Sequence, residues 1–190
     1  MHDLQRQKQK KLDLGRAKNA LQNYLIRKLL IPKVYLDVEW GGSPVDVLAI
    51  DRAGVGDVHA VRIAYYRGKF TETFVETVID HVASPGNDHD SVTVLRSLPS
   101  HFLYIAVVFG KSGSHEFSLP DLNDSKLLAE DGVGRIGILY VDLSGDEPSV
   151  EVKLKAERFR SSKEIVELAD RFVLEHTANW EFRDEPAPIL

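Results

Sequence analysis

The chain has 190 residues, 43% of them hydrophobic and 28% charged, and this composition excludes an intrinsically disordered protein. The absence of cysteine excludes disulfides, thiolate zinc sites, iron–sulfur clusters and cysteine nucleophiles. No apolar run reaches the roughly 18 residues of a membrane span, and the polar, lysine-rich start is unlike a secretory signal. We therefore expect one folded domain in the cytoplasm, with no membrane partner.

The first third of the chain predicts a helix followed by three strands. Apolar residues recur at three- and four-residue spacing over 14–30, and Pro32 ends this helix. Val34–Trp40 alternates apolar and polar residues, as a half-buried strand does. The residues expected on its apolar face are Val34, Leu36, Val38 and Trp40. The apolar runs Val45–Ile50 and Val58–Tyr66 are joined by turn-forming residues, which predicts a hairpin at the centre of a sheet.

The rest of the chain continues with helices and strands. The predicted order is helix, strand, short helix, two strands and a last helix, over residues 70–82, 101–109, 124–130, 135–143, 149–154 and 161–176. The first of these segments also fits a strand, and a loop follows it over 83–91. The predicted organisation is a basic N-terminal arm (1–13), a single domain (14–180) and a loose C-terminal tail (181–190).

Charge is unevenly distributed along the chain. Residues 1–33 hold nine Lys or Arg and two Asp, a net charge of +7. Residues 34–190 hold fifteen Lys or Arg and twenty-seven Asp or Glu, a net charge of −12, and the two parts together give −5. Such a basic arm can neutralise nucleic-acid phosphates, and Lys10, Lys11 and Arg16 are its candidate contacts. It can equally pack against its own acidic body or against a protein partner, including a second copy.

One strand carries a resemblance to a known family. Gly42–Asp51, with Asp46 at the start of an apolar run, resembles the central acidic strand of the PD-(D/E)XK nuclease superfamily. Gly132–Val141 and Val150–Phe159 are similar to the closing part of some such proteins. The resemblance covers the element order over about 14–175. It implies a restriction-endonuclease-like α/β fold of three layers, with a central mixed sheet flanked by helices.

The family's active site is only half present. Two carboxylates on neighbouring strands hold Mg²⁺ there, and a lysine beside them activates water. Asp46 matches the first carboxylate, but Arg62 and Ala64 stand where the second carboxylate and the lysine are expected. The helix over 14–30 also has no acidic residue. The resemblance therefore implies a catalytically inactive module that binds nucleic acid, through Arg62 and the arm, or a protein. In a simpler interpretation, Asp46 caps a turn or pairs with Arg62.

In an alternative interpretation the protein is an active enzyme. If the ligands have moved, Asp46, Asp57 and His59 would form the catalytic site of a phosphodiesterase, with Asp46, Asp57 and Glu39 holding Mg²⁺ or Mn²⁺. Asp57 follows Gly56, however, and is more naturally a turn residue. Without this alternative we expect no cofactor.

A second motif gives no nucleotide site. Gly132–Gly137 has the GxGxxG spacing of dinucleotide-binding proteins. Here the glycines follow a predicted helix and open a strand, so that no helix N-terminus faces the phosphate. We therefore expect no nucleotide cofactor.

Overall fold

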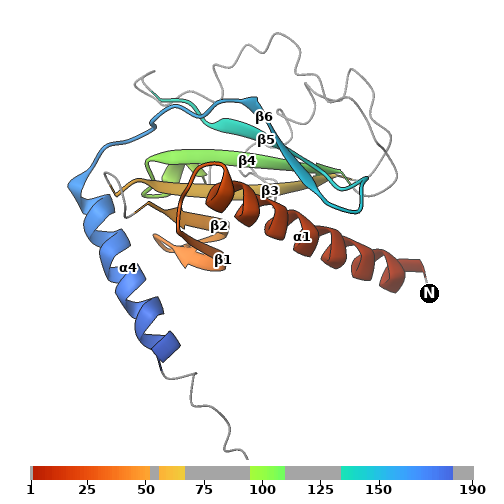
Figure 1. The fold of residues 1–190 in the computed structure, drawn as a ribbon, viewed down its shortest axis with the longest axis horizontal. Helices are drawn as coiled ribbons and strands as arrows, with labels where there is room; N and C mark the ends of the chain where they lie inside the picture. Colours follow the sequence, from red (N-terminus) through yellow and green to blue (C-terminus); the bar gives the residue numbers. More distant parts are fainter. Residues whose placement is uncertain (1, 52–55, 67–94, 110–133, 182–190) are drawn as a thin grey trace, which may run out of the picture.

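The structure is a computed structural model that describes residues 2–51, 56–66, 95–109 and 134–181 (Figure 1). The helices predicted over 70–82 and 124–130, the loop over 83–91 and most of the predicted tail lie outside these residues. No helix in the described part is both long enough and apolar enough to cross a membrane.

The described chain forms a six-stranded mixed sheet between two helices. The elements are α1 (His2–Arg27), β1 (Lys33–Trp40), β2 (Ser43–Ile50), β3 (Val58–Tyr66), β4 (Phe102–Phe109), β5 (Gly137–Asp142), β6 (Ser149–Leu154) and α4 (Lys163–Glu181). The strands lie side by side in chain order, with β3, β4 and β5 parallel and the other neighbours antiparallel. The predicted α/β class with a central mixed sheet flanked by helices is confirmed, as is the antiparallel pairing of β2 with β3.

Each helix covers its own face of the sheet. Ala17, Leu21 and Leu25 follow one another at four-residue steps on α1 and are buried against one face, together with Val47 and Val61. On the other face, residues of α4 pack around a second core. This core includes Trp40, Leu48, Leu103, Ile165, Ala169 and Phe172. Full burial of one leucine side chain stabilises the fold by roughly 2 kcal/mol, and each core buries several such apolar side chains.

The prediction that Val34, Leu36, Val38 and Trp40 share one apolar face of β1 is wrong for the second half of the strand. Val34 and Leu36 pack in the core under α1, but Val38 and Trp40 pack in the core on the α4 side. Asp37, between the two pairs, has a backbone φ of 52°, in the left-handed region. This conformation breaks the alternation of side chains along the strand. Asparagine and aspartate tolerate it better than most residues do, so the polar Asp37 is well suited to the position.

Helix α1 begins earlier and ends earlier than predicted. It runs unbroken from His2 to Arg27, across the expected boundary at residue 13. Burial changes at that point: residues 4–12 are all exposed, whereas Asp13 is fully buried and accepts hydrogen bonds from Gln9 (2.7 Å) and the Tyr65 hydroxyl (2.7 Å). Figure 1 shows the N-terminal end of α1 extending past the strands. The arm is thus the first part of a long helix.

Two glycines of the GxGxxG motif, Gly134 and Gly137, have a packing role, while Gly132 lies outside the described residues. A Cβ on Gly134 would lie 2.4 Å from Phe159 Cα, and one on Gly137 would lie 2.7 Å from the backbone nitrogen of Ala156. The chain before β5 and the chain after β6 therefore approach too closely for a side chain. Arg135 and Glu157 form an isolated antiparallel β-bridge between these two segments.

Candidate functional site

The candidate site lies where the β1–β2 hairpin separates from the rest of the sheet. β2 pairs with β3 only over Val47–Ile50, while its first half, residues 43–46, pairs with β1 alone. A pocket of about 420 Å³ opens beside this first half. Its charged lining residues are Asp37, Glu39, Asp46 and Arg62.

Asp46 ends the pairing of β2 with β3. Its Oδ2 accepts the backbone N–H of Ile63 at 2.8 Å, in the place of a β2 carbonyl. The same oxygen lies 3.7 Å from Nη1 of Arg62, which donates to the carbonyl oxygen of Pro44 at 2.8 Å. The expected proximity of Asp46 and Arg62 is therefore present, whereas the Asp46 carboxylate accepts an N–H of the neighbouring strand β3 and not one of a turn. The side chains of Asp46 and Arg62 are 21% and 22% exposed.

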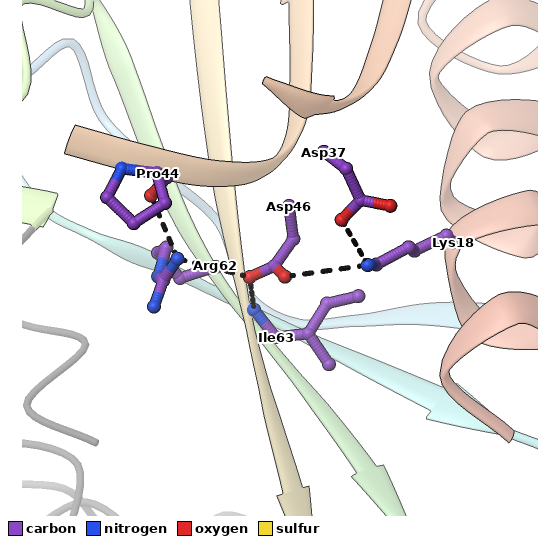
Figure 2. A network of polar contacts seen from close by, with 6 residues as sticks. All are labelled: Lys18, Asp37, Pro44, Asp46, Arg62 and Ile63. Atoms are coloured by element: carbon purple, nitrogen blue, oxygen red, sulfur yellow. Dashed lines mark hydrogen bonds and ion pairs between the residues drawn. The ribbon is translucent and has the colours of Figure 1, made fainter. Parts of the chain in front are cut away.

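A second cation reaches Asp46 from α1. Lys18 Nζ lies 3.8 Å from Asp46 Oδ1 and also forms an ion pair and hydrogen bond with Asp37. Figure 2 shows Lys18 and Arg62 on opposite sides of the Asp46 carboxylate. The carboxylates of Asp37 and Asp46 are thus neutralised by cations of the protein itself.

This arrangement does not fit the metal that the family resemblance implies. Mg²⁺ needs carboxylate oxygens that turn toward one point. Here an ammonium contacts both Asp37 and Asp46, and the guanidinium of Arg62 adds repulsion for a further cation. Glu39 lines the same pocket, but among the described residues no three His, Asp or Glu side chains are arranged to hold a metal ion.

Asp57 lies far from Asp46. It is beside Asp51, whose N–H donates to the Asp57 carbonyl at 2.8 Å, five residues beyond Asp46 along the chain. At the rise of an extended strand this separation is roughly 17 Å. The Asp57 carboxylate is paired with Arg158 and lies 3.8 Å from Nδ1 of His101. The structure therefore does not bring Asp46 and Asp57 together on one metal ion.

His59 is a buried neighbour of this second cluster. Its ring stacks on Phe102 at 4.7 Å and on Tyr104 at 6.1 Å between centroids, and it is 9% exposed. Its Nδ1 is buried without a hydrogen-bond partner in the described structure. Burial lowers the pKa of His59 to about 4, against a smaller opposing effect of Asp57. His59 is therefore neutral at physiological pH.

The predicted nucleic-acid contacts do not form one surface. Arg16 donates to the carbonyl oxygens of Leu143 (3.3 Å), Gly145 (2.7 Å) and Asp146 (3.2 Å), so that it joins α1 to the β5–β6 turn. Lys10 Nζ lies 5.8 Å from the centre of the Tyr65 ring, and Lys11 is exposed. Arg62 belongs to the pocket at Asp46. Of the four residues, Lys10 and Lys11 lie in the exposed part of α1.

Two residues of the site were missed by sequence reasoning. Lys18 sits at the edge of the apolar helix face, four residues after Leu14, and only the docking of α1 brings it to Asp37 and Asp46. Asp37 occurs at a polar position of an alternating strand and carries no signal of its left-handed backbone. A link between residues of a helix and two strands is not visible in local spacing.

The pairing of Arg62 with Asp46 makes a testable prediction. Arg62→Ala and Asp46→Asn should each lower the free energy of unfolding, and the double variant should recover about 1 kcal/mol of the summed loss, because the pair is partly buried. Asparagine keeps an oxygen for the Ile63 N–H, so the cycle isolates the charge. Urea unfolding measures the three losses. Losses that add within about 0.5 kcal/mol would show that the two charges are independent.

Comparisons with known proteins place the chain in no family. No family model matches it, and no curated protein does. It is similar to the SPO1766 protein of unknown function from Silicibacter pomeroyi, with 15% identity, a TM-score of 0.49, and coverage of 94% of this chain and 95% of the other.

Proposed function

We propose that this protein is a non-catalytic binding module of the cytoplasm that contacts the phosphate backbone of nucleic acid through the exposed start of α1. The contact surface is residues 4–12, called here the basic segment. The observation that carries the proposal is that these nine consecutive helical residues are all exposed and hold four cations and no carboxylate.

The basic segment does not contribute a buried apolar face to the fold. Its apolar residues Leu4 and Leu12 are 67% and 63% exposed, and the other seven are polar. A mostly polar helix segment gains little from packing, so that it commonly serves contacts outside its own domain. Its cations are Arg6, Lys8, Lys10 and Lys11, and they occur over two turns of helix. Each cation that reaches a phosphate releases a counterion, which drives binding without base specificity.

The pocket at Asp46 supports a non-catalytic role. A nuclease-like reaction in this family requires carboxylates that are free to bind a metal ion. Lys18 instead pairs with Asp37 and Asp46, and Arg62 pairs with Asp46, so that these two carboxylates are already neutralised. We infer that the resemblance to nucleases, if it reflects ancestry, extends to the scaffold and not to the reaction.

The salt dependence of binding tests the proposal. Affinity for a fluorescein-labelled DNA duplex, measured by anisotropy, should fall about two decades between 50 and 200 mM salt if about four phosphates are contacted. The variant Lys8→Gln/Lys10→Gln/Lys11→Gln should reduce this fall to less than one decade, because most of the released counterions are lost.

A matched variant controls for the change in net charge. Lys33→Gln/Lys155→Gln/Lys163→Gln removes three exposed lysines outside the basic segment and should leave the salt dependence unchanged. Equal losses of affinity in both variants would contradict the proposal, and so would undetectable binding of DNA and RNA at 50 mM salt. In the second case a protein partner would replace nucleic acid.

A further inference from the structure

A second surface of α1 faces the β5–β6 hairpin across a groove. The groove has a volume of about 720 Å³ and lies between the second half of α1 and the hairpin turn with the start of β6. On the helix side it is lined by Arg16, Asn19, Asn23, Arg27 and Lys28 among others. On the hairpin side it is lined by Asp146, Glu147, Pro148, Ser149 and Val150.

The charges of this groove are separated along its length. Arg16 donates a hydrogen bond to the carbonyl oxygen of Asp146 at 3.2 Å. The β5–β6 turn, which carries Asp146 and Glu147, therefore lies beside Arg16 on α1. Arg27 follows eleven residues later, about 16 Å further along the helix axis. The groove therefore has Asp146 and Glu147 near one end, where Arg16 reduces the net charge to −1, and the exposed Arg27 and Lys28, a net +2, at the other.

Two amides lie between the charged ends. Asn19 and Asn23 are exposed, and in the described structure neither amide has a hydrogen-bond partner. They are four residues apart on the helix, a rise of about 6 Å. Two residues of an extended peptide span about 6.7 Å, so successive amides can meet alternate backbone groups of such a chain. An asparagine amide both donates and accepts, which suits a peptide backbone.

We propose that this groove binds an extended peptide segment of about five residues, with its cationic end at Asp146 and Glu147 and its anionic end at Arg27 and Lys28. The length follows from the roughly 16 Å between the ends and the rise of about 3.3 Å per extended residue. The separated charges favour a peptide over a nucleic-acid strand, because the carboxylates at one end repel phosphates along a uniformly negative backbone.

Two designed peptides test the proposal. Both are blocked hexapeptides with two lysines, two threonines and two glutamates. In the first the lysines come first and the glutamates last, whereas in the second the charges alternate. The first should bind about ten times more tightly in anisotropy, because only its charges match both ends of the groove. In NMR spectra it should shift the side-chain amide signals of Asn19 and Asn23.

Variants of the groove separate its binding from other contacts. Arg27→Glu/Lys28→Glu should weaken binding of the first peptide by at least about tenfold, whereas Lys155→Glu/Lys163→Glu, an equal charge change elsewhere, should not. Equal affinity for both peptides, or no binding at millimolar concentration, would overturn the proposal. Shifts of the asparagine amides with a short oligonucleotide instead would assign the groove to nucleic acid. The lysines of the basic segment are not changed in any of these variants, so the outcome is independent of that proposal.

Discussion

Replacement of Gly134 by alanine is expected to lower the free energy of unfolding by about 3 kcal/mol. The new methyl group would lie 2.4 Å from Phe159 Cα and 2.6 Å from the carbonyl oxygen of Arg158. Both are backbone atoms, so no side-chain rotation relieves the contact and the two chain segments must separate. The loss is measured by urea unfolding, followed through tryptophan fluorescence, to which the buried Trp40 contributes.

Gly15 provides the matched control for this substitution. It lies inside α1, where an added methyl group would meet no neighbouring atom within 4 Å, and its φ is not positive. Gly15→Ala should therefore stabilise the protein by up to about 1 kcal/mol, since alanine is the better helix former. A Gly134→Ala variant as stable as the wild type would mean that the chain before β5 and the chain after β6 are not in close contact.

Acidification is expected to destabilise the fold by about 3 kcal/mol through His59. Its pKa is about 4 in the folded protein and about 6.5 in the unfolded chain, because burial disfavours the charged ring. Between these values the unfolded state binds more protons. The contribution of His59 is therefore complete above pH 6.5 and is lost as the pH falls through 4. Burial also lowers the pKa of His101, which acts in the same direction.

The variant His59→Phe isolates this effect. Phenylalanine can keep the stacking on Phe102 and Tyr104 and has no titrating group. Unfolding free energies of both proteins, measured from pH 7 to pH 4, should differ in slope, with the wild type losing about 3 kcal/mol more. Parallel pH profiles would indicate that His59 is not buried in the folded state.

The effect at His59 concerns the strand that positions the pocket at Asp46. β3 carries His59 at one end and Arg62 and Ile63 further along, and it pairs with β4 over nearly its whole length. Loss of packing at the His59 end therefore loosens the strand that holds Arg62 beside Asp46. The charge cycle at Asp46 should consequently be measured near neutral pH, where His59 is neutral.

The sequence by itself determined the elements whose signal is local. The four-residue spacing of Ala17, Leu21 and Leu25 specified the buried face of α1, and the paired apolar runs specified the β2–β3 hairpin. The hairpin in turn brought Arg62 to Asp46, because the antiparallel register follows from the turn between two neighbouring strands. These features depend on residues close together in the chain, where periodicity and turn chemistry carry the information.

Only the tertiary structure decided the features that join distant segments. Lys18 reaches Asp37 and Asp46 because α1 docks across the sheet, and this contact changes the pocket from a possible metal site to a neutralised one. Asp57 lies roughly 17 Å from Asp46 because the register places them at opposite ends of the β2–β3 pair. Spacing along the chain cannot distinguish a ligand from a carboxylate already paired with a distant cation, since the charge balance is set by packing.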